Sequence, residues 1–300
     1  MPIDIDLSDL KTVKVRDAGA FEILEIERDD CIGSISLMGG QVLTYSSHGQ
    51  RPILWENSRL ELSASAALRQ GIPICWPWFG PLSQNQKPVI QQFQQDQPPS
   101  HGYVRDSIWE LVSVNEKAEF TEVILAKGLD QPGLQGLGVT MSYRFSDRLE
   151  CRLTSHNQTK QPVNLSFALH TYLAVSDIKN ISIHDLDGIP YIDSLDRGAK
   201  HVQAGHVAFD KEVDRIYYNT PPLIRVKDAG WNRTISLEAP ESHSSVIWNP
   251  WIDKSKRLSQ FTPDSYREMV CVETARAASD FVEIPASEQH QVTLTLRSSS

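Results

Sequence analysis

The chain has 300 residues, of which 40% are hydrophobic and 22% charged, so it can bury a sizeable core. It contains no run of about 18 apolar residues, which excludes a membrane-spanning helix. The net charge of −9 argues against non-specific binding to nucleic acid or to anionic membranes. A chain of this charge that binds an anion must do so with a few local arginines or lysines.

The N-terminus and the cysteines indicate in which cellular compartment the protein is found. Residues 1–6 are acidic and lack the basic-then-apolar pattern of a secretion signal. The cysteines lie far apart and form no CxxC pair, which predicts free buried thiols rather than a zinc or redox site; they are Cys31, Cys75, Cys151 and Cys271. These features predict a cytoplasmic protein.

Alternation with a period of two dominates the chain from end to end. In the clearest case, residues 139–145 and 149–154 alternate apolar and polar side chains around a turn at 146–148, which predicts an antiparallel hairpin with one buried face. Similar runs recur at 21–26, 31–37, 108–114, 122–125, 163–169, 181–183, 224–226, 234–237, 245–248, 269–273 and 291–296. Many short strands of this kind predict an all-β sandwich or barrel.

Few segments have a helical pattern. Short helical turns are expected at Leu60–Leu68 and Asp264–Glu268. The Gln- and Pro-rich segment 83–100 is expected to be a mobile loop. Because no change in composition marks a boundary, residues 1–300 are expected to form a single domain.

One stretch, residues 69–81, is too rich in proline for a helix or a regular strand. Its thirteen residues hold two Gly, three Pro, two Trp and one Phe behind Arg69. A fixed, irregular backbone that carries aromatic faces and a cation suits a small, polar, partly anionic ligand. A buried loop that closes the end of a β-structure would have the same composition, so both interpretations stand.

Downstream, His101 and Arg105 flank a glycine in His101-Gly102-Tyr103-Val104-Arg105-Asp106. This segment is either part of a binding site or a solvated loop in which Arg105 pairs with Asp106. His170 ends an apolar strand and shares a face with Ser166 and Ala168 by alternation.

The pair that could transfer protons is His170 with Glu273. Imidazole titrates near neutrality and suits a general acid, although a half-buried, hydrogen-bonded histidine would look the same. Glu273 ends the apolar run 269–272, where burial raises the pKa of a carboxyl group and suits a general base. A structural ion pair with an arginine is the alternative for Glu273.

Motifs for other chemistry are missing from the sequence. It has no HExxH, no GxxxxGK[ST], no GxSxG and no GxGxxG, and its nine histidines show no convincing metal spacing. No metal and no redox cofactor are therefore expected.

Taken together, five segments resemble the aldose 1-epimerase superfamily, and within it the hexose-6-phosphate mutarotases, also called glucose-6-phosphate 1-epimerases. They are 69–81, 101–109, 169–173, 212–217, and 246–251 with 271–273, in the family's order along the chain. The resemblance implies the galactose-mutarotase-like β-supersandwich of mostly antiparallel strands. Thr274-Ala275 departs from the Pro-Gly expected after the base, which affects the following loop rather than the base itself.

The resemblance also implies roles for single residues. His170 would be the general acid and Glu273 the general base for exchange between the α and β anomers of D-glucose 6-phosphate or a related aldohexose 6-phosphate. Arg69 and Arg105 would hold the phosphate.

The remaining implied contacts are to the sugar itself, from His101 and Asp214. The expected partner is a small-molecule hexose 6-phosphate, with no nucleic acid and no membrane, and the protein is expected to be a monomer. Two other functions remain open: a non-catalytic carbohydrate or sugar-phosphate binding protein, and a glycosidase with Asp214 as its second carboxylate.

Overall fold

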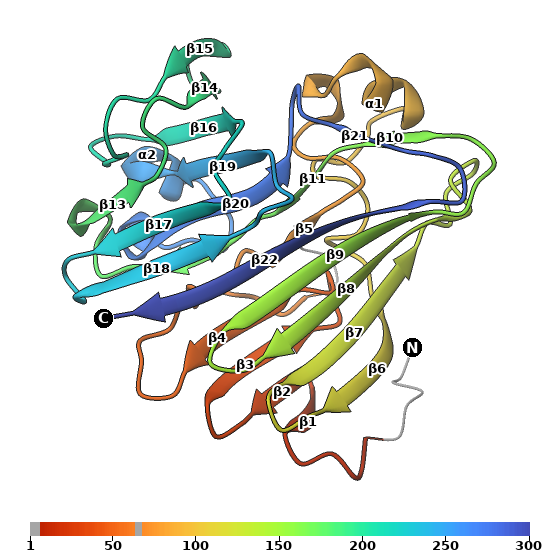
Figure 1. Ribbon diagram of the computed structural model, residues 1–300, viewed down its shortest axis with the longest axis horizontal. Coiled ribbons are helices and arrows are strands. Elements are labelled where there is room, and N and C mark those ends of the chain that lie inside the picture. Colours follow the sequence, from red (N-terminus) through yellow and green to blue (C-terminus); the bar gives the residue numbers. More distant parts are fainter. Residues whose placement is uncertain (1–6, 64–67) are drawn as a thin grey trace.

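The computed structural model describes residues 7–63 and 68–300, and within them the protein is built almost entirely from antiparallel strands (Figure 1). This confirms the predicted all-β class. The expected turn at Leu60–Leu68 overlaps residues 64–67, which lie outside the described residues.

Four sheets organise these strands. The first is an N-terminal meander of β1 (Val13–Asp17), β2 (Glu22–Glu27), β3 (Cys31–Ser36) and β4 (Val42–Ser47). A two-stranded sheet pairs β10 (Val163–Leu165) with β21 (Val282–Ile284). The other two sheets have eight strands each and are named here after one strand of each, β22 and β20.

The β22 sheet is the larger of these two by strand length. Its order is β13 (Ile181–His184), β17 (Leu223–Asp228), β18 (Arg233–Glu238), β22 (Gln289–Ser299), β9 (Leu149–Asn157), β8 (Leu137–Phe145), β7 (Thr121–Gly128) and β6 (Glu110–Glu116). The predicted hairpin is β8–β9, closed by the pair Phe145 and Leu149. Its alternate apolar side chains are buried, as the period of two requires.

The β20 sheet carries the candidate site. Its order is β15 (Ala199–Val202), β14 (Pro190–Asp193), β16 (Val213–Tyr218), β19 (Ser244–Asn249), β20 (Met269–Arg276), β11 (Phe167–Leu169) and β5 (Ile74–Cys75), and β12 (Tyr172–Ala174) also pairs with β20. Successive residues of β20 point to opposite faces. Val270 and Val272 enter the main core, which also holds Ile235 and Leu294 of the β22 sheet. Cys271 and Glu273 therefore point to the other face.

In the part of the chain that the structure describes, helices are few and short. They are η1 (Leu82–Gln84), α1 (Lys87–Gln92), η2 (Ile178–Asn180), α2 (Trp251–Ser255) and α3 (Ser265–Glu268). The last confirms the turn expected at Asp264–Glu268. Segment 83–100 includes part of η1 and the whole of α1, and Val89 and Phe93 are buried there, with the Phe93 ring 5.4 Å from the Trp78 ring.

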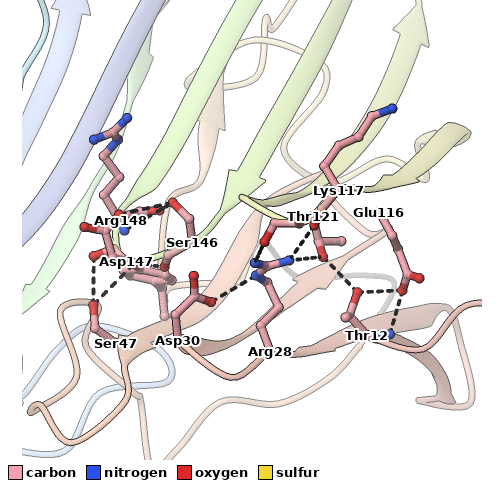
Figure 2. Close-up of polar contacts among 12 residues, drawn as sticks. Thr12, Arg28, Asp30, Ser47, Glu116, Lys117, Thr121, Ser146, Asp147 and Arg148 are labelled. Carbon is pink, nitrogen blue, oxygen red and sulfur yellow. Dashed lines mark hydrogen bonds and ion pairs between the residues drawn. The ribbon is translucent and has the colours of Figure 1, made fainter.

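Polar side chains join the N-terminal meander to the β6–β7 hairpin (Figure 2). Glu116 accepts hydrogen bonds from the backbone N–H groups of Lys11 and Thr12 at 2.9 and 2.6 Å, and from the Thr12 hydroxyl at 2.6 Å. Arg28 donates to the Lys117 carbonyl at 3.2 Å and to Asp30 at 2.9 Å. The bonds to Glu116 and Lys117 hold the meander against one edge of the β22 sheet, and the bond to Asp30 orients Arg28 within the meander.

The four cysteines are free and buried, which confirms the prediction for their state. Among the described residues no helix is long and apolar enough to cross a membrane.

Candidate active site

Neighbouring strands bring the predicted acid and base together. Glu273 lies on β20, and His170 lies in the two-residue break between β11 and β12, both of which pair with β20. The backbone N–H of His170 donates to the Pro73 carbonyl at 2.9 Å, and that of Tyr172 to the Gly71 carbonyl at 2.8 Å. The irregular segment 69–81 thus fixes the backbone on either side of the histidine.

The two side chains form a close buried pair. His170 Nε2 lies 3.4 Å from Glu273 Oε1, and the residues are 8% and 1% exposed. Neither His170 Nδ1 nor Glu273 Oε2 has a hydrogen-bond partner among the described residues. The Tyr172 ring stacks on the imidazole at 4.8 Å with an interplanar angle of 10°.

Burial shifts the pKa values of the pair in opposite directions. It lowers the pKa of His170 well below its ordinary value, and His101, Arg105 and Arg69 lower it further. Burial and the charge of Asp214 raise the pKa of Glu273 well above its ordinary value, against the effect of Arg105. Both shifts favour the uncharged form of the group, a neutral imidazole at His170 and a neutral carboxyl group at Glu273.

Arg105 and His101 reach the pair from a turn packed against residues 76–80. The turn has φ of +69° at His101 and +76° at Gly102, where a Cβ would lie 2.0 Å from the Trp76 carbonyl oxygen, so only glycine fits. The His101 and His170 rings are 6.0 Å apart. Burial, followed by Arg105 and Arg69, lowers the pKa of His101 to about 3.

Arg69 lies at the start of the irregular segment, on a backbone held by amide side chains. Asn57 Nδ2 donates to the Arg69 carbonyl at 3.1 Å, and Gln41 Nε2 donates to the Gln70 carbonyl at 2.7 Å. Its guanidinium group lowers the pKa values of His101 and His170, as that of Arg105 does. Both arginines thus act on the same small region.

Neither arginine has a counter-ion within residues 7–63 and 68–300. Among the described residues, no carboxylate forms an ion pair with Arg69 or Arg105, and the expected alternative of an Arg105–Asp106 pair does not occur. Arg105 is only 8% exposed, and its Nε has no hydrogen-bond partner. A buried cation without a partner is costly, so this arrangement favours an anionic ligand.

Asp214 approaches from β16, opposite Trp248 of β19. Burial raises its pKa, while Lys254 and a hydrogen bond from Ser194 act in the other direction. Lys254 Nζ lies 2.8 Å from Glu212 Oε1 and 3.9 Å from Asp214 Oδ2. The structure therefore brings Asp214 within electrostatic reach of Glu273, with a lysine behind it.

An aromatic wall that the sequence did not reveal borders the pair. Beyond Tyr172, ring contacts run to Trp55 at 6.0 Å, from Trp55 to Phe261 at 5.3 Å, and from Phe261 to Trp248 at 6.4 Å. Trp248 lies 6.0 Å from His170, which closes the circuit. Tyr172 and Trp248 lie in the segments 169–173 and 246–251 that resemble the family, whereas Trp55 and Phe261 carried no sequence signal.

The aromatic residues of segment 69–81 have a different place. Trp76 and Trp78 are fully buried in the main core, where their indole N–H groups donate to Ser155 at 2.9 Å and to the Pro99 carbonyl at 3.1 Å. Only Phe79 faces the site, with its ring 5.1 Å from that of His101. The buried-loop interpretation therefore holds for Trp76 and Trp78, while a binding role for Arg69, at the start of the segment, stays a prediction.

Three potential metal ligands meet in the site. Atoms of His170, Cys271 and Glu273 lie within 4.8 Å of one another. Burial, followed by Glu273, raises the pKa of the Cys271 thiol well above its ordinary value, which opposes the thiolate that a metal requires. The positive potential of the two arginines also disfavours a dication, so the trio is better suited to proton transfer.

Comparisons with known proteins identify the family of the chain. The aldose 1-epimerase family model matches residues 22–297. A protein from Cenchrus ciliaris named "Putative glucose-6-phosphate 1-epimerase" is 28% identical over 278 residues, which cover 86% of this chain and 79% of that protein. One of the same name from Escherichia coli is 28% identical over 262 residues, covering 86% of this chain and 84% of that protein.

Solved structures show the same fold. A crystal structure described as a "putative mutarotase" from Salmonella typhimurium matches with a TM-score of 0.87 at 24% identity, covering 100% of this chain and 97% of that one. A galactose mutarotase-like protein from Clostridium acetobutylicum matches with a TM-score of 0.77 at 15% identity, covering 96% and 98%. The fold is therefore galactose-mutarotase-like, as expected. Because the family model matches residues 22–297, nearly the whole of this chain, the chain belongs to the aldose 1-epimerase family.

Proposed function

We propose that the protein interconverts the α and β anomers of an aldohexose 6-phosphate, with D-glucose 6-phosphate as the first candidate. The observation that carries the proposal is that Arg69 and Arg105, which form no ion pair with the described carboxylates, both act on a buried His–Glu pair. Arg69 and Arg105 bind the phosphate, since a guanidinium group donates two parallel hydrogen bonds to such a group. The relatives from Cenchrus ciliaris and Escherichia coli are named for the same substrate.

The chemistry needs two coordinated proton transfers. Glu273, as carboxylate, takes the proton of the C1 hydroxyl while His170, as imidazolium, gives a proton to the ring oxygen. The ring opens to the aldehyde, the C1–C2 bond rotates, and closure on the other face reverses both transfers. Each acid–base contribution is roughly 10²–10⁴-fold.

Two further residues orient the sugar. His101, kept neutral by its pKa of about 3, and Asp214 hydrogen-bond its hydroxyl groups. Both anomers are substrates, so a useful grip holds the parts that do not change. The phosphate is such a part, and holding it leaves C1 free to invert.

Anomer exchange measured by magnetisation-transfer NMR tests the proposal. Exchange of glucose 6-phosphate above the uncatalysed rate is expected, with much slower exchange of free glucose and galactose. Alanine at His170 or Glu273 should abolish it. Free galactose exchanging as fast as the phosphate ester would refute the role of the arginines, and tight binding without exchange would make the protein a non-catalytic binding protein.

The arginines can be tested separately. R69M and R105M should raise KM for glucose 6-phosphate roughly 10- to 150-fold, because a hydrogen bond to a charged group contributes about 1.5–3 kcal/mol. Free glucose should be affected far less. R257M is a matched control, since Arg257 is exposed and has no ion-pair partner among the described residues.

A further inference from the structure

A single lysine lies between two carboxylates at the rim of the candidate site. Lys254 Nζ is 2.8 Å from Glu212 Oε1 and 3.9 Å from Asp214 Oδ2, and the lysine side chain is 31% exposed. The ammonium group also lies 5.8 Å from the centre of the Trp248 ring. Among the described residues, Lys254 is the one cation that forms an ion pair with either carboxylate.

These contacts connect Lys254 with the proton-transfer pair. Asp214 and Trp248 are directly opposite each other on β16 and β19, and residues paired in this way share one face of a sheet. The Trp248 ring is 6.0 Å from the His170 ring, and His170 Nε2 is 3.4 Å from Glu273 Oε1. The lysine therefore lies behind the wall of the site rather than beside the reacting atoms.

The backbone that places Lys254 is strained and firmly held. Trp251, the first residue of α2, has φ of +53°, which is unfavourable for a large side chain. Its backbone N–H donates to Asn249 Oδ1 at 2.9 Å, while Asn249 Nδ2 donates to the carbonyl groups of Tyr266 and Met269 at 2.8 and 2.9 Å. Strain of this kind persists only where the surroundings impose it, and it is concentrated at functional sites.

The ammonium group favours the charged form of Asp214. Burial raises the pKa of this carboxyl group, and Lys254 acts against that effect. An ionised carboxylate accepts stronger hydrogen bonds from hydroxyl groups than a neutral carboxyl group does. Because Lys254 is already paired with two carboxylates, it is less suited to bind a phosphate than Arg69 and Arg105, which have no such pair among the described residues.

We propose that Lys254 is a positioning residue for substrate binding: anchored by Glu212, it holds the Asp214 carboxylate in place for the hydroxyl groups of the sugar. The proposal rests on the function proposed above and adds a residue to its site. Lys254 acts only through Asp214, so its removal should weaken the binding of phosphorylated and free sugars by the same factor.

Anomer exchange by K254M tests the role. KM for glucose 6-phosphate should rise roughly threefold to thirtyfold, while kcat changes by less than about twofold, as expected for loss of one coupled neighbour of a binding residue. K254R keeps the charge and should recover most of the loss. The melting temperature of K254M should stay close to that of the wild type, because partly exposed ion pairs contribute little to stability.

Lys256 provides a matched control. It directly follows α2, is exposed and forms no ion pair with the described residues, so K256M should behave as the wild type. A double-mutant cycle then shows whether Lys254 acts through Asp214. D214N alone should raise KM, and adding K254M to D214N should change KM little further, because the carboxylate that the ammonium group holds is gone.

The outcomes separate this role from the proposed function. If the wild type exchanges glucose 6-phosphate but K254M equals it, or the effects of K254M and D214N multiply, the role of Lys254 is wrong and the function stands. A loss confined to the phosphorylated sugar, with kcat/KM for free glucose unchanged, would refute the role as well, because Lys254 would then bind the phosphate.

A wild type that exchanges no sugar would refute the proposed function instead. Calorimetric titration with glucose 6-phosphate then decides about Lys254. Weaker binding by K254M than by K256M would support the role, whereas equal dissociation constants, or no binding by the wild type, would refute it.

Discussion

Replacing Glu273 by glutamine should abolish activity and at the same time stabilise the fold, increasingly so as pH rises. Glu273 is 1% exposed, and burial together with Asp214 raises its pKa well above the ordinary value. The neutral amide has nearly the same shape and cannot ionise. The perturbation therefore removes the titration of one buried carboxyl group and little else.

The sign and size follow from proton linkage. Above about pH 4.3, the ordinary pKa of a glutamate, the unfolded chain has lost this proton while the folded protein keeps it. The unfolding free energy of the wild type then falls by about 1.4 kcal/mol per pH unit until the pH passes the pKa of Glu273 in the folded protein. E273Q lacks this slope. At about 2 °C per kcal/mol, its advantage in melting temperature should grow by about 3 °C per pH unit.

Thermal unfolding of both proteins between pH 5 and pH 8 checks this. His170 contributes a slope of opposite sign below about pH 6.5 in both proteins, so the difference between them isolates Glu273. E283Q, at an exposed position of β21, is the control and should show no growing gap. A gap between E273Q and the wild type that stays constant, or one that reverses at pH 8, would refute the reasoning, and full anomer exchange by E273Q would refute its role as base.

Three further predictions concern the turn, the N-terminal contacts and the tuning of the base. G102A should unfold at a much lower temperature than G19A and lose activity, because both glycines have positive φ but only the Cβ at 102 would meet backbone atoms; equal losses would contradict this. E116Q should lower the free energy of unfolding, measured by urea denaturation at pH 7, by less than about 1 kcal/mol, since solvent screens the site. Partial burial opposes ionisation of Glu116, but hydrogen bonds from Thr12 outweigh it and lower the pKa. The difference in unfolding free energy between E116Q and the wild type should therefore vanish as the pH falls through that lowered pKa. A difference that persists in acid would be inconsistent with this. D214N should lower the pKa of Glu273 and move the acid limb of the kcat/KM profile to lower pH; an unmoved limb would show that the two carboxylates are not coupled.

The strands were predictable because one face of most of them is buried. In β8 every second side chain is apolar over nine residues, and in β9 Leu149, Cys151 and Leu153 follow the same pattern before the buried but polar Ser155 and Asn157. A period of two then fixes both strands and their inward faces. The same counting placed His170 on the face opposite Phe167 and Leu169, both of which are in the main core. Local pattern and tertiary burial agree at these positions.

The contacts around the arginines could not be derived from any local pattern. The backbone near Arg69 is held by Gln41 and Asn57, and the turn that carries Arg105 packs on Trp76, so each contact joins distant parts of the chain. Composition also could not divide the aromatic residues of 69–81 between core and site. Their assignment depends on the two-residue strand β5, which pairs with β11 and is too short to leave a recognisable pattern.

On β20, core and candidate site are interleaved: Val270 and Val272 fill the interior, while Cys271 and Glu273 face the other way. Deleting a single residue between them would exchange the two sets, pressing a carboxyl group into the core and a valine against the histidine. A substitution in β20 changes one side chain, whereas an insertion or deletion changes the orientation of every side chain that follows it in the strand. During divergence of such chains, insertions and deletions should therefore accumulate in the connections and be purged from this strand, even where the individual side chains change.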